Sequence, residues 1–282
     1  MGARFEGLNA IVTGASRGIG AATAQRLAAE GANVAITART VDHHEKLAGS
    51  LNETAAAMRT FGNKVATIAA DMANDADRAR IVPEAVDALG GPIDILVNNA
   101  AAAMYASMLD YPLRRRRIMF EINVHGPIDL AQAVIPPMRE RGRGWIVNVS
   151  SATARHAPGP PFRTEGVASV IGVYGGSKAA LNRMTNALAV ELYESGIRIN
   201  TVEPRAAVMS EGAEALVGNI VKDEQIESME AMVESIVALC DCDADRTGRV
   251  HVSLDLLDEL GITVMTLDGS APYPGGQRVW RG

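Results

Sequence analysis

The sequence has few cysteines and no pattern of metal ligands. Its 282 residues include only two cysteines, Cys240 and Cys242, which are separated by one residue in an acidic stretch. This spacing is too tight for a normal disulfide loop, and no second cysteine or histidine pair completes a zinc site. We therefore predict reduced thiols and no metal site, which fits a protein of the cytoplasm.

The sequence also lacks long apolar runs and an excess of positive charge. No run approaches the length of a transmembrane helix, and residues 1–6 carry no basic-then-apolar signal. The formal net charge of -6 argues against a nucleic-acid partner. The run Arg114–Arg117 is either an anion patch or a solvated helix face, and we favour the second. These features predict a soluble, cytoplasmic protein without membrane or nucleic-acid partners.

Short apolar runs alternate with longer amphipathic stretches from the start of the chain. This alternation is typical of right-handed βαβ units, which form one parallel sheet with helices on both faces. No linker, repeat or shift in composition divides residues 1–282. We therefore predict a single α/β domain with a doubly wound parallel sheet.

The same pattern places the individual elements. We expect strands at 10–12, 34–37, 65–69, 93–97, 145–149 and 197–202, and helical stretches at 19–30, 40–61, 76–89 and 178–195, with a long helical region after 97 that reaches 141. The last strand is either 249–253 or 263–267, and we favour the first. We expect an inserted loop with three prolines at 156–172, a lid at 205–225 and a C-terminal extension at 254–282.

A glycine-rich turn, TGASRGIG at 13–20, follows the first strand. Its spacing is one residue wider at the start than the usual dinucleotide fingerprint. Gly14 allows the sharp turn, and Gly18 and Gly20 let a pyrophosphate approach backbone N–H groups at the positive end of a helix. A glycine trio also fits a plain strand–helix turn, but its position after the first strand favours a nucleotide site.

Tyr174 and Lys178 are four residues apart and share one helix face. A nearby ammonium favours the phenolate and lowers the tyrosine pKa from its reference of about 10. Such a tyrosine can donate and accept a proton near neutral pH. The two residues alone are also compatible with an ordinary surface contact.

The motifs taken together resemble the short-chain dehydrogenase/reductase family. The resemblance covers roughly residues 7–253 and rests on the order of the glycine turn, Asn98-Asn99-Ala100, Asn123, Ser151 and Tyr174-x-x-x-Lys178. It implies a Rossmann-type fold, a nicotinamide cofactor and hydride transfer between a carbonyl and an alcohol.

The resemblance also implies roles for single residues. Tyr174 would be the general acid for reduction and the base for oxidation, and Lys178 would hold the nicotinamide ribose. Ser151 would bind the substrate oxygen, with Ser150 as the alternative, and Asn123 would anchor a water of the proton relay. The residues expected to contact the cofactor are Gly14, Ser16, Arg17, Gly18, Ile19, Gly20, Arg39, Asp71, Met72, Asn98, Ala100, Tyr174, Lys178 and Pro204.

The end of the second strand predicts a preference for NADP(H). Ala38 stands where NAD-dependent relatives place an aspartate, so no carboxylate repels a 2′-phosphate. Arg39 follows directly, and Arg17 can approach the same group from the glycine turn. Asp71 resembles the family aspartate near adenine, although alone it would be a strand-end cap.

The sequence departs from the family pattern at several positions. Ala101 replaces a common glycine, Arg205 follows Pro204 where glycine is usual, and Met209 stands where a threonine often contacts the nicotinamide amide. The loop before Tyr174 is about ten residues longer than usual, and we expect it at the rim of the substrate site.

We predict an NADP(H)-dependent oxidoreductase acting on a medium-sized, apolar carbonyl or alcohol, assembled as a homotetramer or homodimer. Ketones, aldehydes, steroid-like alcohols and acyl-thioesters remain open as substrates. The alternatives are a non-catalytic nucleotide-sensing protein on the same fold and a cofactor-assisted epimerase or dehydratase.

Overall fold

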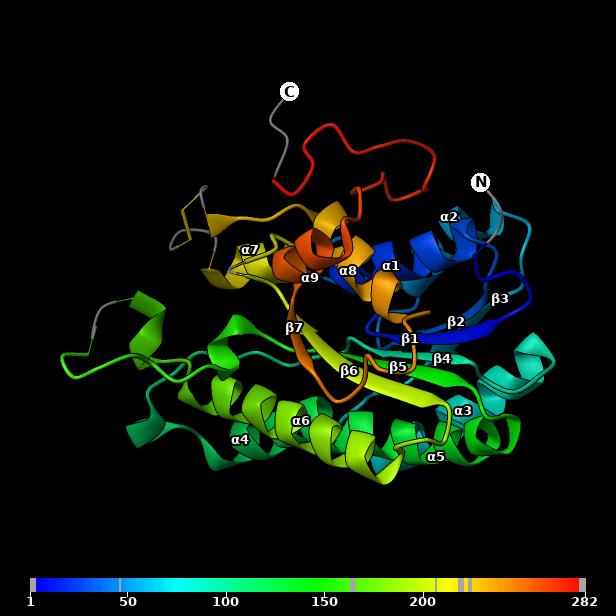
Figure 1. The fold of residues 1–282 in the computed structure, drawn as a ribbon. Helices are drawn as coiled ribbons and strands as arrows, with labels where there is room; N and C mark the ends of the chain where they lie inside the picture. Colours follow the sequence, from blue (N-terminus) through cyan, green and yellow to red (C-terminus); the bar gives the residue numbers. More distant parts are fainter. Residues whose placement is uncertain are drawn as a thin grey trace.

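One parallel sheet forms the centre of the molecule. The computed structural model describes residues 4–45, 47–162, 166–205, 207–217, 221–222 and 225–278. The strands are β1 Asn9–Thr13, β2 Asn33–Ala38, β3 Val65–Ala69, β4 Ile95–Asn98, β5 Gly144–Val149, β6 Ile197–Glu203 and β7 Val250–Val252. They lie in the order β3-β2-β1-β4-β5-β6-β7, and every pairing is parallel (Figure 1). The predicted sheet is confirmed, with the last strand inside 249–253.

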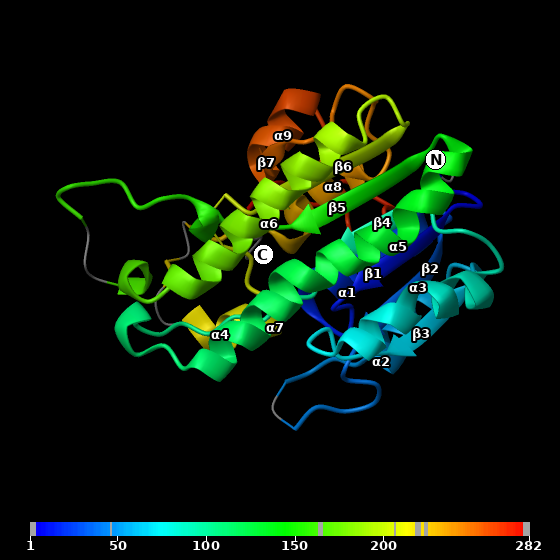
Figure 2. The same ribbon diagram turned by 90° about the horizontal axis from the view of Figure 1, so that it is seen from below.

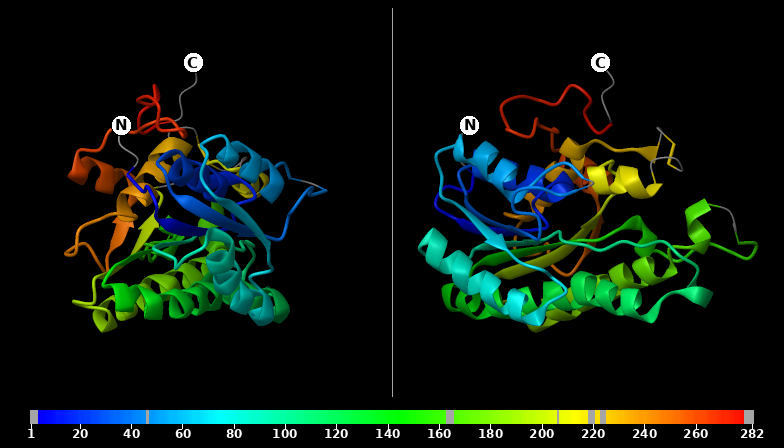
Figure 3. Two further views of the ribbon diagram at one scale, coloured as in Figure 1. Left: turned by 90° about the vertical axis from the view of Figure 1, so that its right-hand side faces the viewer. Right: turned by 180° about the vertical axis from the view of Figure 1, so that it is seen from behind.

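Helices cover both faces of this sheet. One layer contains α1 Gly18–Ala29, α2 Leu51–Arg59, α7 Glu211–Val217, α8 Met229–Leu239 and α9 Ser253–Leu260. The other layer contains α3 Asp75–Leu89, α4 Leu113–Phe120, α5 Gly126–Arg141 and α6 Gly172–Glu191. Figures 1 and 2 show the two layers from the side and from below, and Figure 3 shows the sheet between them from two further directions.

The side chains of β1 alternate between two hydrophobic cores. Ala10 and Val12 belong to the core under α1 and α8, where they are grouped with Ile236. Ile11 belongs to the core under α3 and α5, together with Leu130. Because both faces are covered, the whole strand is buried and apolar residues occupy most of it. The central strands are therefore held from both sides, and their carboxyl ends meet at one edge.

The direction of the chain across the sheet reverses beside β1. From β1 it proceeds to β2 and β3 on one side, and from β4 to β7 on the other. In such a sheet the carboxyl ends of the two strands at the reversal, here β1 and β4, flank the crevice in which ligands bind. The glycine turn and the segment after Asn98 are therefore neighbours.

Three of the predicted helical stretches differ from the structure by more than one residue at an end. The stretch 40–61 is helical only from Leu51, because Gly49 has a φ of 90° and Ser50 caps the helix by accepting from the Glu53 N–H at 3.1 Å. The helical region that was expected to reach 141 is interrupted, and α4 and α5 are joined by a π-helical turn, Glu121–His125.

The helix that carries Tyr174 and Lys178 begins and ends earlier than predicted. It spans Gly172–Glu191 rather than 178–195, so the tyrosine lies within the helix as the i, i+4 argument requires. The predicted end fails because Glu194 has a left-handed φ of 61°, a conformation that an α-helix does not contain.

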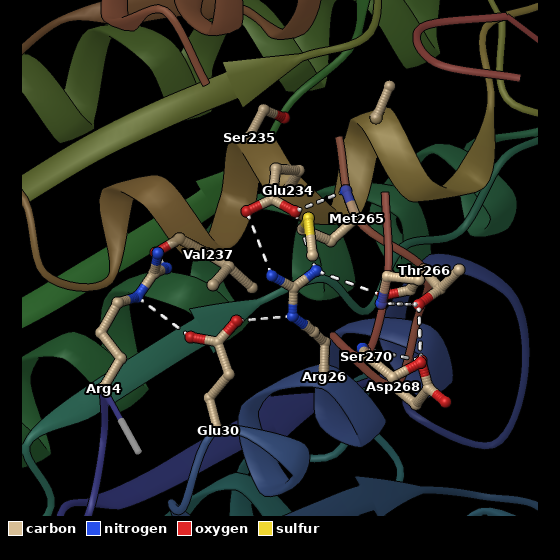
Figure 4. A network of polar contacts seen from close by, with 12 residues as sticks. Arg4, Arg26, Glu30, Glu234, Ser235, Val237, Met265, Thr266, Asp268 and Ser270 are labelled. Carbon is tan, nitrogen blue, oxygen red and sulfur yellow. Dashed lines mark hydrogen bonds and ion pairs between the residues drawn. The ribbon is translucent and has the colours of Figure 1, made fainter. Parts of the chain in front are cut away.

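The segment after β7 packs against α1 through a buried ion pair. Arg26 of α1 donates to Glu234 of α8 at 2.8 Å, and the same carboxylate accepts from the Met265 N–H at 3.2 Å (Figure 4). The region 263–267 forms only an isolated bridge, between Met265 and Pro272, so it is not the last strand of the sheet. None of the helices in the described part of the chain has the length and apolar character needed to cross a bilayer.

Candidate active site

The glycine turn between β1 and α1 is shaped by close packing. Gly14 and Gly18 have φ values of 66° and 56°, which L side chains rarely adopt. A Cβ on Gly14 would lie 2.7 Å from the Cα of Ala100, and one on Gly20 would overlap the Gly14 carbonyl and the Asn99 amide. Gly20 is thus enclosed by the protein itself, so only a hydrogen fits there whether or not a ligand is bound.

Thr13 and Asn99 join this turn to the end of β4. The Thr13 hydroxyl oxygen accepts from the N–H groups of Asn99 at 3.1 Å and Ala100 at 3.0 Å. The Asn99 amide donates to the carbonyls of Thr13 at 3.0 Å and Gly14 at 3.2 Å. Sequence reasoning did not assign a role to Thr13 or Asn99, although both stand in the motifs; their partners are more than 80 residues away in the chain.

The start of α1 suits an anionic group. The preceding residue, Arg17, gives the helix no side-chain cap, so no side chain competes for the N–H groups of the first turn. A cleft of about 550 Å³ lies beside the turn and is lined by Ser16, Arg17 and Gly18 together with Met209. Ile19 packs instead against the core under α1. The N–H groups of the turn therefore fit the phosphates of a dinucleotide, although Glu53, Glu211 and Glu214 also line the cleft.

The two arginines predicted to bind the 2′-phosphate of the adenosine ribose lie in different environments. Arg17 donates through Nε to the Ala48 carbonyl at 2.7 Å and through a terminal nitrogen to the Gly49 carbonyl at 2.8 Å. Its guanidinium is therefore held in place by the loop after β2. Arg39 follows Ala38 at the end of β2, is exposed, and has no hydrogen bond or ion pair with the described residues.

The other residues expected at the cofactor lie at the ends of β3 and β4. The Asp71 carboxylate accepts from the N–H two residues ahead at 3.0 Å, which is the strand-end cap that the residue alone suggested. The Met72 carbonyl accepts from Arg78 at 2.9 Å. Asn98 is buried and donates to Asn148 of β5 at 2.8 Å, so it braces neighbouring strands.

The catalytic candidates come together beside the carboxyl end of β5. Lys178 is only 2% exposed and donates to the Val149 carbonyl at 2.7 Å. Ser151 begins the short 3-10 turn η3, Ala152–Ala154, and its oxygen accepts from the Thr153 N–H at 3.2 Å and hydroxyl at 2.9 Å. The Ser151 hydroxyl also lies close enough to the Tyr174 phenol to favour the ionised form of that phenol. Because its oxygen already accepts twice, the Ser151 hydrogen is the one available to donate.

The pKa of Tyr174 shifts in the direction opposite to the prediction. Burial raises it to about 12, ionised Tyr105 nearby would raise it further, and the Ser151 hydrogen bond opposes both effects. The Tyr105 and Tyr174 rings are 5.8 Å apart between centroids. Burial also lowers the pKa of Lys178 to about 8, and its ammonium is engaged with a backbone carbonyl. Desolvation thus outweighs the attraction on which the sequence argument relied.

Asn123 lies in the π-helical turn and is fully buried. Its side-chain oxygen accepts from the Ala102 N–H at 2.8 Å, and its amide donates to the Ala102 carbonyl at 2.9 Å and to Ser177 at 3.0 Å. Ser177 in turn donates to the Tyr174 carbonyl at 2.7 Å. The side chain therefore ties the segment after β4 to the catalytic helix. π-turns of this kind are frequent at functional sites.

The segment 205–225, which we predicted to be a lid, follows β6 and Pro204. Arg205 forms an ion pair with Asp255 of α9, and its N–H donates to Glu227 at 2.9 Å, so its charge is neutralised within the chain. The residue after Met209, Ser210, packs on the glycine turn: a Cβ on Gly18 would lie 2.8 Å from the Ser210 Cβ. Residues 206, 218–220 and 223–224 of the predicted lid lie outside the described residues.

The inserted loop leaves the body between the carboxyl end of β5 and the amino end of α6 (Figure 2). Residues 155–162 are exposed, and Phe162 exposes 59% of its surface. Residues 163–165 lie outside the described residues, and the loop returns through a 3-10 turn at Gly166–Ser169.

A Rossmann-type sheet with a glycine turn at one end of its crevice and a Ser-Tyr-Lys set at the other defines a class of nucleotide-dependent oxidoreductases. The model of the short chain dehydrogenase family matches residues 8–217. The chain therefore belongs to this family, and the resemblance that its motifs predicted is confirmed.

Relatives and solved structures agree with this assignment. Hydroxysteroid dehydrogenase-like protein 2 of Xenopus tropicalis is 32% identical over 272 residues, which is 96% of this chain and 62% of that protein. The chain thus spans about three fifths of such curated relatives. A short chain dehydrogenase of Mycobacterium thermoresistibile superposes with a TM-score of 0.79 at 29% identity, over 97% of this chain and 94% of that one. A structure described as an NAD(P)-dependent gluconate 5-dehydrogenase of Beutenbergia cavernae, with NADP bound at low occupancy, gives 0.74 at 26% identity, over 90% and 97%.

Proposed function

We propose that this chain is an NADP(H)-dependent enzyme that interconverts an alcohol and a carbonyl on a medium-sized apolar molecule. One observation carries the proposal: Ser151, Tyr174 and Lys178 meet beside the carboxyl end of β5, with the serine hydroxyl close to the phenol and the lysine buried. A bound nicotinamide would supply or accept the hydride, and the glycine turn, Lys178 and Asn98–Ala100 would hold it.

The chain's own residues account for the movement of the proton. In reduction, Tyr174 donates its phenolic proton to the substrate oxygen while Ser151 donates a hydrogen bond to the same oxygen and stabilises its developing charge. In oxidation, the phenolate takes the proton back. Lys178, with a pKa of about 8, holds or releases a proton close to neutral pH beside this pair. Asn123 keeps the catalytic helix in register with the segment after β4.

Preference for NADP(H) over NAD(H) rests on the end of β2. Ala38 brings no carboxylate there, and the exposed Arg39 has no partner in the described chain, so its guanidinium is available to a phosphate. Arg17 is already oriented by two backbone carbonyls, so its ordering costs little additional entropy on binding.

An apolar substrate is supported by the lining of the lid and rim. Met209 lies in the segment after β6, and Phe162 exposes its ring on the inserted loop. Arg205 is paired with Asp255 and therefore does not attract an acidic substrate. The curated relatives carry hydroxysteroid dehydrogenase-like names, which is in keeping with a steroid-like alcohol or ketone.

We infer further that the chain acts as a homodimer or homotetramer in the cytoplasm. Val190 and Tyr193, at the end of α6, each expose 71% of their surface, and a second copy would cover such apolar groups. Both cysteine thiols are free, which suits a reducing compartment.

The test is a turnover screen that follows the absorbance of reduced nicotinamide with a panel of apolar ketones and alcohols. Each compound is run with NADPH or NADP and with NADH or NAD. We expect turnover with NADPH and an apolar ketone. Binding of NADPH without turnover of any compound would instead favour a nucleotide-sensing protein.

A further inference from the structure

A buried carboxylate behind the catalytic serine has no part in the chemistry described so far. Glu203 is the last residue of β6 and is 2% exposed. One of its oxygens accepts from Nε of Arg155 at 2.6 Å, and a terminal nitrogen of the same guanidinium lies 2.6 Å from that oxygen. The arginine side chain is half exposed, so solvent reaches the pair from one side only.

Arg155 is the only cation paired with Glu203 among the residues that the structure describes. The other carboxylate oxygen is buried without a hydrogen-bond partner in that part of the chain, and so is the hydroxyl of Ser150. Ser150 is beside Glu203 in the sheet, because its N–H donates to the Val202 carbonyl at 2.8 Å. A buried carboxylate with one oxygen unpaired is costly, and it depends on its single ion-pair partner.

The pair connects the two segments that frame the substrate site. Arg155 ends the turn η3 that Ser151 begins, and its N–H donates to the Ala152 carbonyl at 3.3 Å. The inserted loop starts at the next residue, while Glu203 immediately precedes Pro204 and the lid. The turn η3 also packs on α6, since a Cβ on Gly175 would overlap the Thr153 carbonyl.

We propose that the Arg155–Glu203 ion pair is a positioning device that fixes the Ser151 turn against the end of β6 and so sets the direction of the serine hydroxyl toward the substrate oxygen. The inference rests on the proposed function. Arg155 and Glu203 are positioning residues: they act on the substrate only through Ser151. A misdirected serine hydroxyl costs transition-state stabilisation, because such donors work only when they are aimed at the developing charge.

The test uses two variants. Glu203→Gln keeps the shape of the side chain and removes its negative charge, and Arg155→Met removes the guanidinium at the half-exposed side of the pair. If Glu203→Gln does not fold, Arg155→Met still tests the proposal. We expect kcat to fall about tenfold in either, with the Kd for NADPH unchanged within about twofold. The double variant should be no slower than either single one, because both remove the same interaction. Arg155→Lys should retain most of kcat. Glu259→Gln, which breaks the exposed Arg246–Glu259 pair, is the control and should leave kcat unchanged.

A second readout does not depend on turnover. Hydrogen exchange of the backbone amides at 150–156, measured without cofactor, should be faster in Glu203→Gln and Arg155→Met than in the wild type or Glu259→Gln. If the wild type turns over no substrate, the proposed function fails while this measurement still decides the positioning role. Three outcomes would overturn the inference. The first is unchanged hydrogen exchange and kcat in the single variants, and the second is a loss of kcat in the double variant equal to the product of the two single losses. The third is a loss of NADPH affinity that parallels the loss of kcat.

Discussion

The catalytic end and the ribose end of the site are built in contrasting ways. Tyr174, Lys178 and Asn123 are tied to backbone groups or to one another, and each depends on a neighbour from another part of the chain. Arg39 extends from the end of β2 into solvent with no partner in the described residues. The first arrangement fixes geometry and changes pKa values through burial. The second arrangement supplies only the positive charge of Arg39, so this residue can be substituted without disturbing the fold.

The largest expected effect is a loss of turnover at the catalytic end, when the Tyr174 hydroxyl is removed. Tyr174→Phe removes the transferable proton and keeps the ring against Tyr105, so kcat should fall by about two to four orders of magnitude. NADPH affinity should remain within a few fold, because we propose that Lys178, which is unchanged in this variant, holds the ribose. Steady-state kinetics and fluorescence titration measure the two quantities. Near-normal turnover would show that Tyr174 is not the proton donor.

The second prediction concerns the scaffold of the catalytic end. Asn123→Ala leaves the Ala102 N–H and carbonyl without their buried partner, so the free energy of unfolding should fall by about 2–4 kcal/mol. Urea denaturation measures this change. Asn186→Ala is the matched control, since Asn186 is exposed and donates to the Gly248 carbonyl at 3.0 Å. Equal losses in the two variants would contradict the bracing role of Asn123.

The third prediction tests the ribose end. Ala38→Asp with Arg39→Gln introduces the repelling carboxylate and removes a charge-assisted bond, so the ratio of kcat/KM for NADP over NAD should fall about 10- to 100-fold. Because Arg39 is exposed, Arg39→Gln alone should change the free energy of unfolding by less than about 0.5 kcal/mol, whereas the half-buried Ala38 adds a larger cost to the double variant. Arg59→Gln, at an exposed arginine on α2, is the control. A wild type that already prefers NAD would refute this reading of β2.

The smallest effect is a pH dependence of stability caused by Lys178. Its pKa is about 8 in the folded chain and 10.5 ordinarily, so between these values the unfolded chain binds more protons. Stability should therefore rise with pH above 8, relative to Lys178→Met, by about 1 kcal/mol per pH unit. The comparison is made between pH 7.5 and 9.5. Above this range, the raised pKa of Tyr174 would make stability fall as pH rises. Parallel curves for the two proteins would show that Lys178 is not desolvated.

Sequence reasoning reached some parts of the site and not others. It placed Tyr174 and Lys178 on one helix and the glycine turn after β1, because both depend on residues close together in the chain. It missed the Asn99–Thr13 bonds and the Arg155–Glu203 pair, whose members are 86 and 48 residues apart. Nothing local distinguishes Glu203 from a surface carboxylate at the end of a strand.

Apolar periodicity by itself determined the alternation of strands and helices and the parallel sheet, since side chains that alternate or recur along one face dictate which surface is buried. Only the tertiary structure decided how the site residues are used. It turned the expected fall in the Tyr174 pKa into a rise to about 12, and it neutralised Arg205 with Asp255. The physical reason is that a charge responds to burial and to partners brought from distant segments, which packing sets and local spacing does not contain.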